Sequence, residues 1–195
     1  LNFVNKFSIL FANLKLKESE MKVTFKGAQA GLLGVVEVGD LAPEVEVLGQ
    51  DLKPVKIGGK QDKVQIIASV PSIDTSVCAT QTRKFNQGAA SNDLVKLSVI
   101  SKDLPFAAKR FCGAEGIDNI GVYSDLHGEF GANYGVVLKD CPLAGLLART
   151  IFVVDKDGVV VYKEIVSEIT NEPNYEAIQE IIKKIGACNG HCGVK

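Results

Sequence analysis

Several features that mark common functional classes are missing from this chain. The 195 residues contain no tryptophan, a single methionine and only two histidines, and the formal net charge is −1. No run of about 20 apolar residues occurs, so a transmembrane helix is not predicted. Because neither sign of charge is in excess, nothing favours a nucleic-acid or anionic-membrane partner. A small molecule or another protein is the expected partner.

Motifs of several enzyme classes are missing as well. The chain has no G-x-S-x-G, no Walker-type phosphate loop and no H-E-x-x-H. A Cys–His hydrolase therefore has no supporting motif, and neither His127 nor His191 is marked as a base. Five cysteines are too few for a disulfide scaffold and odd in number, so at least one thiol stays unpaired. Redox or nucleophilic chemistry is a fair explanation for some of them.

The length predicts one domain with a normal hydrophobic core. Residues 1–20 are interpreted as a leader or non-native extension ahead of Met21, because they hold one lysine before a short apolar centre and no convincing cleavage site. The domain is expected over 21–186. Residues 187–195 form a cysteine-containing tail.

From Met21 onward the hydrophobic pattern alternates between strand and helix periods, which indicates a mixed α/β architecture. A hairpin is predicted from strands 22–25 and 34–38, with Gly27 and Gly31 in its turn. Further strands are expected at 64–70, 94–101, 120–124, 150–155 and 159–165. Helices are expected at 78–87, 104–112, 127–134 and 173–185, with Asp103 as the N-cap of the second and Pro105 in its first turn. A βαβ core, a β-hairpin and a closing helix are the layout of a thioredoxin-like fold, in which helices flank a central mixed sheet.

Cys78 is the strongest candidate for chemistry. A strand ends at Pro71 and a helix begins near Cys78, so its sulfur would face free backbone N–H groups at the positive end of the helix dipole. This position favours the thiolate, the reactive form of cysteine. Thr75 offers a hydroxyl that could accept from a substrate O–H or donate toward the sulfur. Position alone leaves open that Cys78 is a small buried apolar residue.

Three separated segments resemble one family. Pro71 to Cys78 matches the P-x-x-x-T-x-x-C signature of the peroxiredoxins, and PSIDTSVCATQTRKFN, RFCGAEGID and PLAGLLART are similar to the bacterial thiol peroxidases. The resemblance covers about 21–185. It implies a thioredoxin-like fold and a peroxidase without metal, haem or flavin. By match, Pro71, Thr75, Cys78 and Arg149 surround the peroxide, with Cys78 as the peroxidatic cysteine.

Cys112 is the expected partner of Cys78. It lies near the C-terminal end of its predicted helix, where the dipole disfavours a thiolate, although Lys109 and Arg110 partly offset this. Cys78 is thus the better nucleophile, and Cys112 is the better partner for a sulfenic acid already formed. The resemblance implies a disulfide between them within one chain, reduction by thioredoxin, and a homodimer. Local unwinding is expected during turnover, since a disulfide holds its Cα atoms about 5.5 Å apart.

Some residues depart from the family pattern, and some alternatives remain. Cys141 stands where the family has glycine and is interpreted as a spare thiol. The tail residues Cys188, His191 and Cys192 give only a weak zinc or disulfide signal. The alternative activities are a thiol–disulfide oxidoreductase, which would normally carry a second cysteine where Gln81 stands, and a non-catalytic redox sensor or holdase. A cytoplasmic location is expected, with the periplasm as the alternative.

Overall fold

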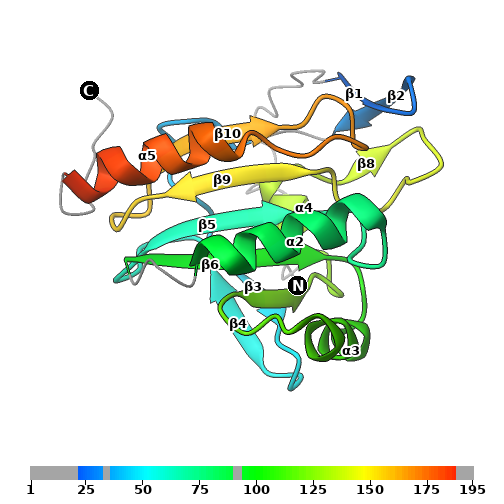
Figure 1. Ribbon diagram of the computed structural model, residues 1–195. Coiled ribbons are helices and arrows are strands. Elements are labelled where there is room, and N and C mark those ends of the chain that lie inside the picture. Colours follow the sequence, from blue (N-terminus) through cyan, green and yellow to red (C-terminus); the bar gives the residue numbers. More distant parts are fainter. Residues whose placement is uncertain (1–21, 33–35, 90–93, 188–195) are drawn as a thin grey trace, which may run out of the picture.

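The structure is a computed structural model, and it describes residues 22–32, 36–89 and 94–187 (Figure 1). The predicted leader 1–20 and the tail residues from 188 onward lie outside this described part. Within it, no helix is long and apolar enough to cross a membrane.

A seven-stranded mixed sheet forms the centre of the domain (Figure 1). Its middle strands β5, β6 and β7 run parallel, and the strands outside them pair antiparallel. All six residues of β5 are buried, as expected of a central strand covered on both faces. The strand order is β10 (Val160–Ile165), β9 (Thr150–Val154), β5 (Val64–Ser69), β6 (Val95–Ser101), β7 (Gly121–Ser124), β3 (Val45–Leu48) and β4 (Pro54–Ile57).

Helices cover both faces of this sheet. α2 (Ser76–Ala89), α3 (Pro105–Glu115) and α5 (Tyr175–Ala187) contribute to one apolar cluster, which takes alternate residues of β5, β6 and β9. The short helix α4 (Glu129–Tyr134) contributes to a second cluster built on the opposite side chains of the same strands. In Figure 1 α2 and α5 lie in front of the sheet and α4 lies behind it. The predicted central mixed sheet flanked by helices is confirmed.

The N-terminal hairpin is present, but its second strand was predicted too late. β1 (Lys22–Phe25) pairs with β2 (Ala28–Leu32), and β2 also pairs with β8 (Leu138–Lys139) in a small separate sheet. Lys26 and Gly27 make the turn, both with positive φ, which suits a two-residue hairpin. Gly31 is therefore a strand residue, and residues 36–38 form no strand. The strands β3, β4 and β8 were not predicted.

Asp103 was predicted to cap α3, and this is wrong. Leu104 occupies the N-cap position, without a side-chain hydrogen bond, while Pro105 is in the first turn as expected. The Asp103 carboxylate instead accepts from Ser72 Oγ at 2.9 Å and from the Ile73 N–H at 2.8 Å. It therefore fastens the loop after β5 to the loop after β6. That first loop leads directly into α2 and Cys78.

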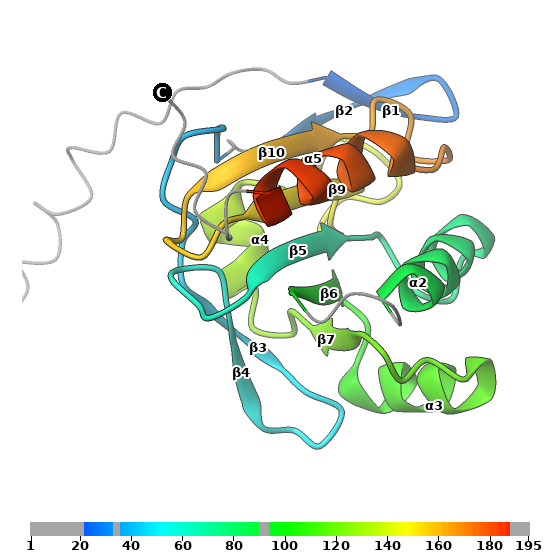
Figure 2. The ribbon, with the colours of Figure 1, turned by 60° about the vertical axis from the view of Figure 1, so that its left-hand side comes forward.

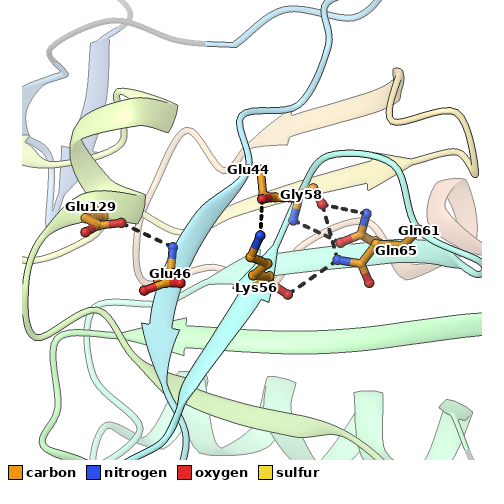
Figure 3. Close-up of polar contacts among 7 residues, drawn as sticks. All are labelled: Glu44, Glu46, Lys56, Gly58, Gln61, Gln65 and Glu129. Carbon is orange, nitrogen blue, oxygen red and sulfur yellow. Dashed lines mark hydrogen bonds and ion pairs between the residues drawn. The ribbon is translucent and has the colours of Figure 1, made fainter.

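The hairpin of β3 and β4 is joined to the rest of the domain by side-chain contacts (Figure 3). β3 pairs with β7 at a single position, so other β3 backbone groups need different partners. The Glu46 N–H donates to the Glu129 carboxylate at 3.2 Å, linking β3 to the first residue of α4. After β4, the buried Gln65 side chain accepts from the Gly58 N–H at 2.9 Å. These contacts fix the hairpin at the edge of the sheet.

Gly58 occupies a backbone position that only glycine can fill, which gives a test of the packing. Its φ is +79°, and an added Cβ would clash with the Pro43 carbonyl oxygen and the Tyr134 hydroxyl. Gly27 is a matched control, because its φ is +80° but a Cβ there would meet nothing within 4 Å. We expect Gly58→Ala to lower the free energy of unfolding by about 2–5 kcal/mol, and Gly27→Ala by only about 1 kcal/mol. Urea unfolding of both variants measures this, and equal losses would contradict it.

Candidate active site

Cys78 lies in the first turn of α2, directly after the loop fastened by Asp103. Its side chain is fully buried and carries a free thiol. The helix begins at Ser76, slightly earlier than the predicted start at Cys78, and the Ala79 N–H donates to the Thr75 carbonyl oxygen at 2.9 Å. The sulfur therefore lies near the N-terminal end of a 14-residue helix.

The guanidinium of Arg149 contacts Cys78 directly. Arg149 stands immediately before β9, is 1% exposed, and donates from Nη2 to Cys78 Sγ at 3.3 Å. The two residues are 71 positions apart in the chain. The same side chain donates twice to the Ile169 carbonyl oxygen, from Nε at 3.0 Å and from Nη2 at 2.9 Å. The planar fork of an arginine can hold these acceptors together, and a lysine could not.

Arg149 has no carboxylate partner among its hydrogen-bond acceptors in the described part of the chain. The charge of Arg149 lowers the pKa of Glu172, but this is the smallest of the effects on that carboxylate. Hydrogen bonds from Lys84 and Tyr175 lower the pKa of Glu172 most. A buried cation without a counter-ion is costly. Among the acceptors of Arg149, the Cys78 sulfur is the one that can carry a negative charge.

Gln81 completes the contacts of Arg149, and sequence reasoning missed this role. Its Oε1 accepts from Nη1 of Arg149 at 2.5 Å, and the side chain is fully buried. Since Arg149 can only donate, the amide oxygen must face it, which leaves Gln81 Nε2 buried and without a partner among the residues that the structure describes. The signal that could have found it is spacing, because residues three apart on a helix share a face. One N–H of Arg149 Nη1 also has no acceptor in the described part of the chain.

Thr75 and Pro71 lie in the loop ahead of Cys78. The Thr75 hydroxyl donates to the Ser72 carbonyl oxygen at 3.0 Å, and it makes no hydrogen bond to Cys78 Sγ. The hydroxyl proton of Thr75 is therefore already used in this hydrogen bond, and the hydroxyl oxygen can still accept a hydrogen bond from another group. Pro71 is buried and follows the end of β5.

Cys112 has a different environment in α3. It is buried as a free thiol and accepts from Nε2 of Gln50 at 3.2 Å. Burial raises the pKa of the Cys112 thiol, and the hydrogen bond from Gln50 offsets part of that rise. Cys112 therefore stays protonated at neutral pH in the folded protein.

Two ion pairs near the protein surface connect α3 to α2 and to the loop ahead of it. Arg110 lies 3.8 Å from Asp74, ahead of α2, and Arg83 contacts Glu115 at 2.7 Å, farther along both helices. Cys78 and Cys112 belong to the same apolar cluster. The structure thus brings Cys78 and Arg149 into direct contact and places Cys112 in the same apolar cluster as Cys78, with Thr75 and Pro71 in the loop ahead of α2.

The remaining candidates do not join this region. Cys141 is a half-buried free thiol that packs against the cluster of the small sheet. Within 22–32, 36–89 and 94–187 no group of three or more His, Cys, Asp or Glu side chains could hold a metal ion. The predicted weak signal at Cys188, His191 and Cys192 lies outside those residues.

Comparison with known proteins identifies the family. The Redoxin family model matches residues 37–178. Curated thiol peroxidases are similar over most of the chain: that of Listeria monocytogenes is 48% identical over 165 residues, covering 84% of this chain and 98% of its own length. The thiol peroxidase of Bacillus subtilis is 47% identical over 166 residues, covering 84% and 98%. The chain belongs to the thiol peroxidase family.

Solved structures agree with this family. A peroxiredoxin-like protein from Aquifex aeolicus matches with a TM-score of 0.82 and 44% identity, covering 84% of this chain and 96% of that one. The thiol peroxidase from Chromobacterium violaceum has a TM-score of 0.76 at 22% identity, covering 84% and 96%, and supports the fold alone. The predicted thioredoxin-like fold and the predicted family are confirmed. The chain is a thiol-dependent peroxidase.

Replacing the arginine fork tests whether the thiol peroxidase site depends on it. Arg149→Lys keeps a positive charge but cannot reach Cys78, Gln81 and Ile169 together. We expect the second-order rate of Cys78 oxidation by peroxide to fall about 100-fold, which is typical of losing a donor aimed at developing charge. Arg83→Lys, in an exposed ion pair, is the control and should change this rate less than threefold, about the effect of a surface pair. Rapid-mix mass spectrometry measures both rates, and a full rate in Arg149→Lys would contradict the assignment.

The raised pKa of Cys112 predicts its reactivity toward alkylation. In the folded reduced protein the rate of Cys112 modification by iodoacetamide should keep rising beyond pH 9.0, the ordinary value for this thiol, because burial favours the protonated form. In urea the rate should level off near the ordinary value. Peptide mass spectrometry resolves this site from the other cysteines. A folded profile that levels off at or below the unfolded one would contradict the prediction.

Proposed function

We propose that this thiol peroxidase reduces hydrogen peroxide and organic hydroperoxides through a sulfenic acid on Cys78, followed by an intrachain disulfide with Cys112. The observation that carries the proposal is the hydrogen bond from the buried Arg149 guanidinium to Cys78 Sγ. An arginine whose other acceptors are neutral favours the negatively charged sulfur. The thiolate is the form of cysteine that attacks peroxides.

In the first step the Cys78 thiolate attacks one peroxide oxygen in line with the O–O bond. The S–O bond forms as the O–O bond breaks, and the departing oxygen takes up a proton to leave as water or an alcohol. The uncommitted N–H of Arg149 and the unpartnered Nε2 of Gln81 can stabilise the charge that develops on the peroxide oxygens. Thr75 can accept from the peroxide O–H, since its own proton is donated to Ser72. We assign Pro71 to the wall of the peroxide site.

In the second step Cys112 resolves the sulfenic acid. Its thiolate attacks the Cys78 sulfur, an S–S bond forms, and the hydroxyl of the sulfenic acid leaves with a proton as water. Because Cys112 is buried and its pKa is raised, it must leave its site in α3 before it reacts readily. The expected local unwinding of the helices would supply this movement. The disulfide prevents further oxidation of Cys78 to sulfinic acid.

The cycle needs a reductant for the disulfide. We propose a thioredoxin, whose dithiol would take over the disulfide by thiol–disulfide exchange and return both cysteines to thiols. Because the protein needs such a reductant, we propose a cytoplasmic location, with the periplasm as the alternative. We further propose that the chain forms a homodimer, as the family resemblance implies. Light scattering at several concentrations measures that assembly.

Two other activities would use the same cysteine. A thiol–disulfide oxidoreductase normally has a second cysteine where this chain has Gln81, and Gln81 is engaged with Arg149. A redox sensor or holdase would use the same oxidation of Cys78 but would not cycle. The number of turnovers separates these activities from a peroxidase.

The cysteines make the decisive variants. With thioredoxin, thioredoxin reductase and NADPH, the wild-type chain should consume many equivalents of hydrogen peroxide or of an alkyl hydroperoxide. Cys78→Ser should abolish this turnover, because no other thiol within the described residues contacts Arg149. Cys112→Ser should oxidise once and stop at sulfenic or sulfinic acid. NADPH oxidation and intact mass measure these results.

Cys141→Ser is the matched control and should keep the wild-type rate, because Cys141 packs in a different cluster. Full peroxide turnover in Cys78→Ser would contradict the proposed mechanism. Consumption of a single equivalent by the wild-type chain would indicate the sensor.

A further inference from the structure

Cys112, the candidate resolving cysteine, accepts a hydrogen bond from the hairpin of β3 and β4. Gln50 lies in the turn between β3 and β4, and its Nε2 donates to Cys112 Sγ at 3.2 Å across 62 positions of the chain. Figure 2 shows this turn beside α3. Gln50 is partly exposed whereas Cys112 is buried, so an amide with access to water is directed at a buried sulfur. None of the residues that resemble the family motif provides this contact.

The turn that carries Gln50 has a defined shape. The Gly49 N–H donates to the Lys53 carbonyl oxygen at 2.9 Å, and the Leu52 N–H donates to the Gly49 carbonyl oxygen at 3.0 Å. Leu52 adopts a left-handed backbone with φ +66°, an unfavourable conformation for leucine that a tightly closed turn imposes. A fixed turn restrains the direction of the Gln50 side chain. Gln50 is therefore held toward α3 by its own element.

Each of the two cysteines has a separate hydrogen-bond donor. Cys78 Sγ accepts from Arg149, and Cys112 Sγ accepts from Gln50. The backbone of Cys112 is also engaged, because its carbonyl oxygen accepts from the N–H groups of Gly116 and Ile117 at the end of α3. Moving Cys112 toward Cys78 must break the bond to Gln50 as well as this C-terminal cap.

We propose that Gln50 is a positioning residue that restrains Cys112 in folded α3 and thereby slows closure of the disulfide. This inference rests on the proposed function, in which Cys112 resolves the Cys78 sulfenic acid. The Gln50 hydrogen bond stabilises the folded helix and is absent from the unwound form that closes the disulfide. It lengthens the lifetime of the sulfenic acid, and it gives a second peroxide more time to carry Cys78 to sulfinic acid.

Gln50→Met tests the restraint, because methionine has a similar length but cannot donate. The reduced full-length chain is mixed with one equivalent of hydrogen peroxide, quenched with acid at intervals, and analysed by mass spectrometry after trapping of sulfenic acid. Disulfide closure should be about two- to tenfold faster, the effect of losing one hydrogen bond from the folded form. The rate of Cys78 oxidation should not change. Under excess peroxide, a smaller fraction should end as sulfinic acid.

Lys53→Ala is the matched control for the turn. It removes the exposed ion pair of Lys53 with Asp51 and leaves Gln50 in place, so closure should proceed at the wild-type rate. Hydrogen exchange gives a second measurement that needs no peroxide: the amides of 112–117 in reduced protein should exchange faster in Gln50→Met than in Lys53→Ala. General loosening of the hairpin would instead affect both variants alike.

The failure of this inference can be told apart from the failure of the proposed function. If the wild-type chain closes a Cys78–Cys112 disulfide but Gln50→Met closes it no faster, or more slowly, the restraint is wrong and the proposed function stands. Equal acceleration in Lys53→Ala would also overturn the restraint. If the wild-type chain forms no such disulfide, both are wrong.

Discussion

The site depends on one buried guanidinium. Arg149 is enclosed by protein, and its acceptors are the Ile169 carbonyl oxygen, the Gln81 amide oxygen and the Cys78 sulfur. Neutral acceptors orient a cation but do not neutralise it, so the full compensation of its charge requires an anion. Ionised Cys78 would supply that anion. In the proposed mechanism, the contact that compensates the charge of Arg149 is also the contact that makes the sulfur reactive.

The fold brings these groups together from distant parts of the chain. β5 and β9 pair side by side, so the residue before β9 lies next to the loop that leaves the end of β5. That loop is held by Asp103 and starts α2 with Cys78 in its first turn. Ile169 comes from the connection between β10 and α5. The central sheet therefore serves as the frame that places an arginine beneath a helix start.

The two cysteines lie in the same cluster but in different polar environments. Cys78 contacts a cation, whereas Cys112 contacts a neutral amide and has a raised pKa. The proposed roles of the two cysteines rest on this difference. α3 continues to Glu115, so Cys112 lies near the end of its helix and not at its last residue. Most of the strands and helices were also predicted from periodicity. The predicted hairpin turn included Gly27 correctly but extended too far, because Gly31 is an equally good turn residue in the sequence, whereas the structure places it in β2.

The sequence by itself determined the alternation of strands and helices, the placement of Cys78 at a helix start, and the motif that indicates the family, because these depend on residues close together in the chain. Only the tertiary structure decided that Asp103 binds the preceding loop rather than capping its own helix, that Gln81 faces Arg149, and that Gln50 reaches Cys112. Each of these is a hydrogen bond between elements far apart in sequence. Such a bond depends on how the elements pack, and local propensity contains no information about it.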